Sequence, residues 1–492
     1  MKNHTLNALC CTIPLLLAGC DNTVPVAQKD DSGIRVKPGD DLRTIVAGAP
    51  AGARFILTKG VYRQQSFVPR DRQEFIAEPG AILNGAMVLR DWRKEGPYWV
   101  QEGLPPPLHP VGMCGSSNDP VERRTCAYRE DLFLDGKVYQ RVDELNAVGP
   151  GRWYFDNGRA YLSDDPSGRL AELSVTPNAI SGSAKGVVLR NLTVEKYASA
   201  AQAGAIDARK SSGWQVIDVR AIWNHGVGIY ISNDMVVRGG SYSYNGQMGM
   251  GGAGSRSVIE GVEIAHNNYA GFMTNWEAGG AKFVYSDGLV LRNNCVHHNK
   301  GNGLWTDIDN INIVIEGNKV FDNEGIGIAH EISYKATIRN NHVARNGRNL
   351  DSWLWGSQIL VQNSQNVDVY GNVVEVAPTY GNGISLIYQN RGAGVYGPYL
   401  TANNNVRENQ VTLRGLKGKS GMVADFEVER FWDKMQNRFH QNRYVVPANS
   451  GRNWSYKGDR QFADAQALGF EKNSTLKVAS DTPMALSCEK AG

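Results

Sequence analysis

Two short stretches of the sequence place a carboxylate at the same distance behind a glycine. Asp307 stands four residues after Gly303, and Glu331 stands four residues after Gly327. A further acid, Asp309, follows two residues after Asp307 and is a third candidate catalytic residue. Paired Asp and Glu side chains are the groups that perform nucleophilic and general acid–base steps at a glycosidic bond. The two stretches therefore predict a carboxylate site, provided that the fold brings them side by side.

The expected distance between these acids depends on how the stretches pair. Neighbouring parallel strands lie about 4.8 Å apart, whereas Asp307 and Asp309 on one strand would lie about 6.6 Å apart. Retaining glycosidases hold their carboxyl groups roughly 5–5.5 Å apart, and inverting enzymes roughly 6.5–9.5 Å apart. A pair of Asp307 and Glu331 on adjacent strands therefore favours a retaining reaction. Neighbouring carboxylates should raise the pKa of Glu331 and suit it to general acid–base work, with Asp307 as the nucleophile.

A repeat of about 21 to 32 residues indicates that the two stretches are such neighbours. Its marks are a glycine followed by an apolar strand, and a second strand followed by asparagine. The glycines stand at positions 228, 249, 271, 303, 327, 383 and 421, with Gly356 a looser match. One repeat fits three short strands and three turns, and successive repeats would pair in parallel. The recurring asparagines can then form a hydrogen-bonded ladder along one turn.

Alternation along each strand predicts which side chains face outward. The apolar residue after each glycine points inward, so the second, fourth and sixth residues form an outward strip with the acids. We expect Trp305 on this strip as a platform for a sugar ring, and His330 on the inward side as a core histidine. The candidate substrate-binding residues are Trp305, Asn275, Trp276, Glu277, Lys282 and Tyr334. Trp353 and Trp355 flank an irregular repeat and are further candidates for the groove.

The same acids also suit a metal ion. Clustered carboxylates bind Ca²⁺, so Glu277, Asp307 and Asp309 form a candidate calcium site, and we expect no other cofactor. His297 and His298 are expected to have structural roles. No cysteine or histidine spacing typical of zinc is present in the sequence.

The repeat resembles the right-handed parallel β-helix superfamily, the fold of pectate lyases. The resemblance implies an all-β fold with an N-terminal helical cap, a small antiparallel β insertion and a C-terminal cap. The segment Gly303-Leu304-Trp305-Thr306-Asp307, followed about one coil later by Glu331, is similar to the β-helical retaining β-xylosidases. That resemblance implies an Asp nucleophile and a Glu acid/base on successive coils. It does not identify the sugar, because the other substrate-binding residues do not match clearly.

Changes in composition predict the segment boundaries. The expected segments are a lipoprotein signal peptide (1–19), a tether (20–33), an N-terminal cap with the first coils (34–91), an inserted β-hairpin subdomain (92–175), the main coils with the active-site strip (176–428) and a C-terminal cap (429–492). Leu17-Ala18-Gly19-Cys20 resembles a bacterial lipobox, which implies acylation of Cys20 and anchoring to the inner or outer membrane, facing the periplasm. In that oxidising compartment Cys114 and Cys126 are expected to form a disulfide, Cys295 is expected to be a small core residue, and the state of Cys488 is open.

The net charge limits the classes of molecule that the protein is expected to bind. A net charge of +3 over 492 residues gives no basic surface of the kind that binds nucleic acid. We therefore expect a monomeric carbohydrate-active enzyme of the cell envelope, most simply a retaining glycoside hydrolase. A polysaccharide lyase or uronan epimerase, with Lys282 as base and Ca²⁺ as charge neutraliser, is the alternative enzyme. A non-catalytic glycan-binding lipoprotein is the alternative without chemistry.

Overall fold

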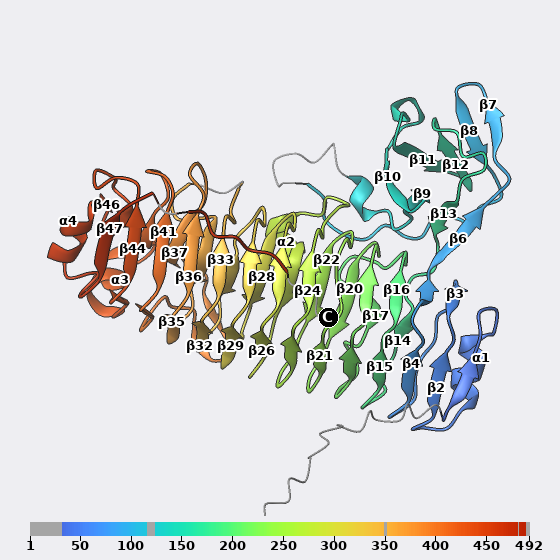
Figure 1. The fold of residues 1–492 in the computed structure, drawn as a ribbon, viewed down its shortest axis with the longest axis horizontal. Coiled ribbons are helices and arrows are strands. Elements are labelled where there is room, and N and C mark those ends of the chain that lie inside the picture. The colour runs from blue at the N-terminus through green and yellow to red at the C-terminus, as the bar shows by residue number, and fades with distance from the viewer. Residues whose placement is uncertain (1–31, 116–123, 349–351, 481, 489–492) are drawn as a thin grey trace, which may run out of the picture. The chain divides into compact units, whose positions relative to one another are not determined.

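Most strands pair in parallel with the equivalent strand one repeat earlier and one repeat later. The computed structural model describes residues 32–115, 124–348, 352–480 and 482–488, and the part from Gly33 onward forms one unit. Its strands stack into three long parallel sheets, so each repeat is one coil of a parallel β-helix (Figure 1). The predicted all-β fold is confirmed. Cys20 lies outside the described residues, so its lipidation and the membrane location stay predictions.

Four sheets form the three sides of the coils. The thirteen-stranded sheet contains β1 (Ile34–Val36), β2 (Arg54–Leu57), β4 (Glu74–Ala77), β15 (Val188–Arg190), β18 (Gln215–Ile217), β21 (Val236–Arg238), β23 (Val258–Glu260), β26 (Val290–Arg292), β29 (Ile313–Glu316), β32 (Ala336–Arg339), β35 (Val367–Tyr370), β40 (Asn405–Arg407) and β43 (Arg438–His440). The sheet that carries the carboxylates, called the site sheet below, contains β14 (Ile180–Ser181), β17 (Gly204–Asp207), β20 (Val227–Ile231), β22 (Met248–Gly252), β25 (Gly279–Phe283), β28 (Asn302–Asp307), β31 (Ile328–Glu331), β34 (Ser357–Gln362), β37 (Asn382–Tyr388), β42 (Ser420–Ala424), β45 (Trp454–Ser455) and β46 (Asp459–Arg460). The third side begins with a four-stranded sheet of β3 (Gly60–Arg63), β5 (Ala81–Asn84), β16 (Thr193–Glu195) and β19 (Arg220–Ile222). It continues with an eight-stranded sheet of β24 (Glu263–Ala265), β27 (Cys295–His297), β30 (Lys319–Phe321), β33 (His342–Ala344), β36 (Val373–Val376), β41 (Gln410–Leu413), β44 (Arg443–Val446) and β47 (Thr475–Val478).

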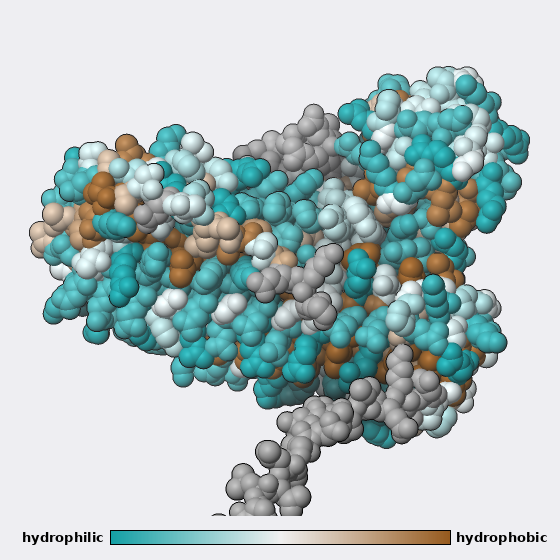
Figure 2. Space-filling model, viewed as in Figure 1, coloured by the Kyte–Doolittle hydropathy of each residue, from teal (hydrophilic) through white to brown (hydrophobic). Residues whose placement is uncertain are grey.

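The inside of the coils is one continuous hydrophobic core. Ile229, Met250, Leu304 and Ile328 stack in register along it and are at most 1% exposed. Because alternate side chains of a strand point to opposite faces, the polar residues of the same strands face outward. The face shown in Figure 2 is accordingly mostly hydrophilic along the coils.

Buried asparagines form two ladders, one more than the single ladder that the repeat predicted. In one ladder Asn299 Nδ2 donates to Asn323 Oδ1 at 2.8 Å, and Asn323 Nδ2 donates to Asn346 Oδ1 at 2.8 Å. The other ladder runs through Asn294, Asn318, Asn341, Asn372, Asn409 and Asn442. Each amide also bonds backbone groups of neighbouring coils, so the ladders satisfy buried polar atoms at the turns.

The insertion is a sheet of eight strands that pair antiparallel, except for the parallel pair of β10 with β11. It contains β6 (Ala86–Leu89), β7 (Arg93–Glu95), β8 (Tyr98–Gln101), β9 (Leu132–Leu134), β10 (Lys137–Arg141), β11 (Arg152–Asp156), β12 (Arg159–Leu162) and β13 (Ala171–Ser174). Both predicted hairpins are present, β9 with β10 and β11 with β12. The sheet begins before residue 92, because β6 pairs with β13 rather than with a coil. The predicted disulfide joins Cys114 to Cys126, and the adjoining backbone bonds to the coil of the site: Met273 N donates to Met113 O at 2.9 Å.

The ends of the β-helix differ in how well the sequence predicted them. At the N-terminal end, helix α1 (Leu42–Gly48) is capped by Asp41, as expected. At the C-terminal end the predicted cap is wrong in part, since β43, β44 and β45 continue all three sheets in parallel. Short helices α3 (Val428–Lys434) and α4 (Phe462–Ala467) flank this coil. No helix of the described residues is long and apolar enough to span a membrane.

The last described residues form a strap across the eight-stranded sheet. The carbonyl of Met484 accepts from Arg345, and that of Ser487 accepts from the Lys319 ammonium, one coil earlier. Cys488 then forms a disulfide with Cys295 on β27. The expectation that Cys295 is a free core residue is therefore wrong. The local sequence around Cys295 contains no trace of a partner that lies 193 residues away.

The asparagine ladders should contribute measurably to the free energy of unfolding. Replacement of Asn323 by Ala removes the acceptor of the buried Asn299 backbone N–H and one donor to Asn346 Oδ1, so we expect unfolding free energy to fall by about 3 kcal/mol. Urea unfolding followed by circular dichroism measures the change. The control is Asn449→Ala, at an exposed turn residue, which should change stability by no more than about 0.5 kcal/mol. Equal effects of the two substitutions would contradict a structural role for the ladder.

Candidate active site

The outer face of the site sheet brings the two predicted carboxylates together. Strand β28 pairs with β31 in the register Leu304 with Ile328 and Asp307 with Glu331. Their backbones therefore lie one strand spacing apart, about 4.8 Å. Both residues lie at the carboxyl end of their strand, where Ile308 and Ile332 adopt positive φ angles of 58° and 35°. A β-branched residue rarely adopts this conformation, so the chain accepts local strain directly behind each carboxylate.

The coil before β28 has a different register from the one predicted. Lys282 on β25, and not a residue of the 272–277 segment, pairs with Trp305. Gly271 does not match Gly303; the position equivalent to Gly303 is Gly280, in a coil longer than its neighbours. Residues 274–277 form the short helix α2 (Thr274–Glu277) instead of an outward strand. Asn275 is exposed there and contributes nothing to the carboxylate pair.

Lys282 makes a buried ion pair with Asp307. Its Nζ lies 2.8 Å from Asp307 Oδ2, and the two side chains are 8% and 7% exposed. The same ammonium donates to the carbonyl of Trp276 at 3.0 Å and lies 3.9 Å from the centre of the Trp305 ring. Asp307 Oδ1 is buried without a hydrogen-bond partner among the described residues. One carboxylate oxygen is thus fixed while the other keeps its lone pairs for another group, which is the arrangement that a nucleophile needs.

Glu331 has a different environment from Asp307. Burial raises the pKa of Glu331, and the Asp307 carboxylate raises it further. The Arg391 guanidinium, with Nη1 2.5 Å from Glu331 Oε1, acts in the opposite direction on this pKa but does not cancel the rise. A carboxyl group with a raised pKa is suited to donate a proton. Sequence reasoning missed Arg391, because it lies 60 residues further along the chain and no motif surrounds it.

Asp309 is not part of the pair. Ile308 and Asp309 both have positive φ, so the chain turns and directs Asp309 toward the loop that carries Arg391. Asp309 Oδ1 accepts hydrogen bonds from Tyr399 Oη at 2.7 Å and from Val395 N at 3.1 Å. The prediction of a catalytic Asp309 at the end of a straight strand is therefore not supported by its place in the fold. Tyr334 acts on the same loop, since its hydroxyl donates to the carbonyl of Gly397 at 2.7 Å.

Trp305 is on the outer face but is not an exposed platform. It is 6% exposed and packs in an apolar cluster on that face. The cluster also contains Ile326, Ala329, Leu354, Leu360 and Ile387, with Trp353 and Trp355 partly buried against it. Alternation correctly placed Trp305 outside the coil, but it could not show that the irregular segment around Trp353 and Trp355 covers it. Its indole Nε1 lacks a hydrogen-bond partner among the described residues.

Glu277 and His330 complete the set of predicted residues. Glu277 is 9% exposed, and its carboxylate accepts from the Gln202 amide; burial raises its pKa, with a further contribution from the Asp307 charge. His330 is fully buried between Thr306 Oγ1 and the carbonyl of Tyr334, and burial lowers its pKa to about 4. The expectation of a core histidine is confirmed.

The predicted calcium ligands do not converge. Lys282 occupies Asp307 Oδ2, and Asp309 is held by Tyr399 and Val395. Among the described residues, groups of ligand atoms close enough for one ion involve only histidines and cysteines, which lie at the eight-stranded sheet and on the strap that crosses it. The carboxylates of this site are instead matched by the cations Lys282 and Arg391.

Comparisons with known proteins agree with this fold. A family model described as a right-handed β-helix region matches residues 204–374. The solved structure entitled "The complex structure of XylC with xylose" has a TM-score of 0.60 at 13% identity, covering 92% of this chain and 86% of that one. A structure entitled "Glycoside hydrolase" has a TM-score of 0.50 at 10% identity, covering 80% and 96%. No curated protein matches the sequence. The chain thus has the right-handed parallel β-helix fold, and residues 204–374 match the family model of that fold.

The Lys282–Asp307 pair can be tested without knowledge of the substrate. Lys282→Met leaves a buried carboxylate without its cation, so we expect a loss of about 3–5 kcal/mol of unfolding free energy. The double variant Lys282→Met/Asp307→Asn removes both charges and should recover most of that loss. Denaturant unfolding of the two single variants and the double variant measures the coupling. Lys419→Met, in the more exposed pair with Asp459, is the matched control and should cost no more than about 1 kcal/mol. Additive losses from the two substitutions would contradict a direct interaction.

Proposed function

We propose that the protein is a retaining glycoside hydrolase in which Asp307 is the nucleophile and Glu331 is the general acid/base. The observation that most directly supports this proposal is that Asp307 on β28 pairs with Glu331 on the neighbouring parallel strand β31. One strand spacing, about 4.8 Å, is close to the separation of roughly 5–5.5 Å at which retaining enzymes hold their carboxyl groups. The second support is the difference between the two environments, an ion pair for Asp307 and a raised pKa for Glu331.

In the first step the Glu331 carboxylic acid donates its proton to the glycosidic oxygen. Asp307 Oδ1 attacks the anomeric carbon, the bond to the leaving oxygen breaks, and a glycosyl ester of Asp307 forms. In the second step the Glu331 carboxylate takes a proton from water, the oxygen of that water attacks the anomeric carbon, and Asp307 is released. Lys282 holds Oδ2 throughout, which directs Oδ1 toward the sugar. Retention of configuration follows from two displacements at the same carbon.

Xylosides are the first substrates to examine, because the XylC structure was solved with xylose. The likeness in fold does not decide the sugar, so the panel should include other aryl pentosides, aryl hexosides and uronans. A lyase or epimerase is the second candidate, since Lys282 and Arg391 offer positive charge for a uronate carboxylate. A lyase forms a double bond and its product absorbs ultraviolet light, whereas a hydrolase product does not. In the structure the Lys282 ammonium is a donor in an ion pair, which favours the hydrolase.

The different roles of Asp307 and Glu331 predict different losses of activity when each residue is replaced. Asp307→Asn should abolish turnover, because no ester can form. Glu331→Gln should lower kcat/KM about 10²- to 10⁴-fold on alkyl glycosides, but much less on aryl glycosides whose leaving group needs no proton. NMR of the first product formed should show the anomeric configuration of the substrate. Glu316→Gln, on the thirteen-stranded sheet of the same coil, is the control and should retain activity. Unchanged activity in Glu331→Gln, or an inverted product, would refute the proposal.

The raised pKa of Glu331 predicts how activity depends on pH. Activity requires the protonated acid, so kcat/KM should fall as pH rises through the raised pKa of Glu331, above the usual value of 4.5. Arg391→Gln removes the charge that lowers this pKa, so the alkaline limb should move to higher pH. The pH profile of kcat/KM on an alkyl glycoside, whose leaving group needs the proton, measures the shift, with Arg339→Gln on another sheet as the control. A shift to lower pH, or no shift, would contradict the assigned acid.

A further inference from the structure

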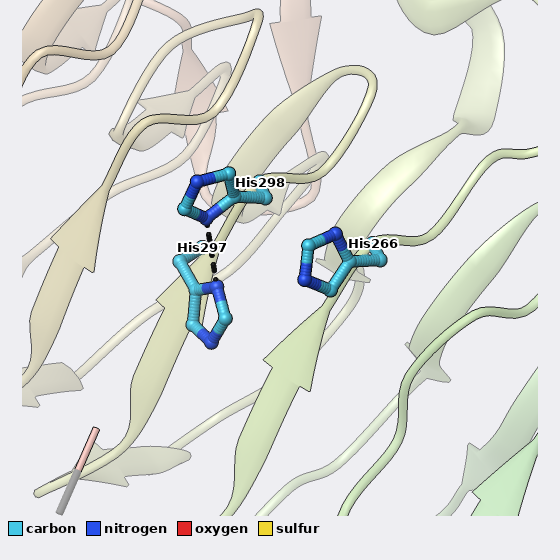
Figure 3. A group of neighbouring side chains, drawn as sticks. All are labelled: His266, His297 and His298. Carbon is cyan, nitrogen blue, oxygen red and sulfur yellow. Dashed lines mark hydrogen bonds between the residues drawn. The ribbon is translucent and has the colours of Figure 1, made fainter. Parts of the chain in front are cut away.

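Three histidines gather on the eight-stranded sheet, on a different side of the coils from the carboxylate pair. His297 ends β27, and His266 and His298 directly follow β24 and β27. Because Ala265 pairs with His297, His266 and His298 occupy the same turn position on adjacent coils, with φ angles of 56° and 53°. Figure 3 shows the three rings turned toward a common region. The parallel register thus brings His266 of one coil next to the consecutive residues His297 and His298 of the following coil.

The ring nitrogens are close enough to share one ion. One ring nitrogen from each histidine lies within 4.8 Å of those of the other two. The Nδ1 atoms of His297 and His298 are 2.9 Å apart, and the ring centres of His266 and His298 are 5.2 Å apart. Nitrogens bound to a tetrahedral zinc at 2.0–2.1 Å lie roughly 3.4 Å from one another. Small rotations of the partly exposed rings, which move the nitrogens by about 1 Å, would therefore bring all three nitrogens to metal-binding distance.

A carboxylate behind His297 sets the direction of its ring. His297 Nε2 lies 3.4 Å from Glu263 Oε1, and Ser241 Oγ donates to Glu263 Oε2 at 2.9 Å. A proton on Nε2 facing Glu263 leaves the Nδ1 lone pair of His297 directed toward His298. Metal-binding histidines commonly have such a carboxylate on the other ring nitrogen, which fixes the tautomer and strengthens the ligand.

Neighbouring aromatic rings hold the cluster in place. Tyr244 stacks on His266 with ring centres 4.7 Å apart and an angle of 10°, and Phe321 stacks on His297 at 5.0 Å and 10°. Rings that are already packed lose less freedom on binding a ligand, which favours affinity. The nearby cation Arg345 is neutralised by Asp322, with Arg345 Nε 2.9 Å from Asp322 Oδ1.

We propose that His266, His297 and His298 bind one divalent transition-metal ion, with Zn²⁺ as the representative. Imidazole nitrogens suit Zn²⁺, Cu²⁺ and Ni²⁺, and three histidines leave a fourth position for water. The ion joins the coil of β24 to the coil of β27, next to the disulfide that ends the strap. This inference does not depend on the proposed hydrolase.

The competing explanation is an aromatic row without a metal. Trp223, Tyr244, His266 and His298 stack along one turn of successive coils. Substitution by Phe separates the two explanations, because it keeps an aromatic ring and removes the ligand nitrogen. If the histidines only stack, the Phe variants should change no metal binding.

The experiment is titration of the untagged chain with ZnCl₂ by calorimetry, with its disulfides oxidised. We expect one Zn²⁺ per chain, an increase in Tm on binding, and at least a tenfold loss of affinity in His266→Phe and in His298→Phe. Glu263→Gln keeps all three ligands and should weaken binding about 10- to 100-fold. His342→Phe, at an exposed histidine of β33, is the matched control and should bind as the original protein does. X-ray absorption at the zinc edge should show three imidazole nitrogens.

Two results would overturn the proposal. One is no saturable binding of Zn²⁺, Ni²⁺ or Cu²⁺; the other is affinity that stays unchanged in His266→Phe and His298→Phe. Circular dichroism of each metal-free variant checks that it is folded. Should a Phe variant fail to fold, Glu263→Gln and the absorption spectrum still decide the outcome, since neither removes a ring from the stack.

Discussion

The parallel hydrogen-bonded register between β28 and β31 is the constraint on which the site depends. It sets Asp307 opposite Glu331 and fixes the separation of their backbones at one strand spacing. A slip of one residue would turn one of the two carboxylates into the apolar core, because the side-chain period of a strand is two. The asparagine ladders bond the same coils at their turns, from Asn299 to Asn323 and from Asn318 to Asn341. The ladders therefore help to hold the register that the chemistry requires.

The cations on either side of the carboxylate pair give Asp307 and Glu331 different properties. Lys282 bonds Asp307 on one side, and Arg391 bonds Glu331 on the other. The like charges of Asp307 and Glu331 are neighbours in the middle, and both are largely buried. Ionising both is costly in such a site, and burial together with the Asp307 charge raises the pKa of Glu331. An acid with a raised pKa beside a carboxylate held in an ion pair is what a general acid and a nucleophile need.

The sequence predicted the parts of the site that depend on the repeat. Asp307 and Glu331 have the same offset from a glycine, so counting residues was sufficient to pair them. Counting residues from Gly271 gave the wrong partner for β28, because α2 lengthens that coil. Gly280 takes the position equivalent to Gly303. Counting also failed at Asp309, because nothing in the sequence signals that the β-branched Ile308 adopts a positive φ. Arg391 and Cys488 reach their partners through contacts between distant segments, which no local pattern describes.

The turn at Ile308 has a consequence beyond the correction of Asp309. Unfavourable conformations of this kind persist only where surrounding contacts enforce them. Here Asp309 N donates to the carbonyl of Ile332 at 3.0 Å, and the Asp309 carboxylate accepts from Tyr399 and Val395. The turn thereby ties the end of β28 to the segment that carries Arg391. Since Arg391 acts on the pKa of Glu331, the position of that segment affects how readily the proposed acid holds its proton. The strained turn behind Asp307 is thus linked, through one loop, to the protonation of its partner.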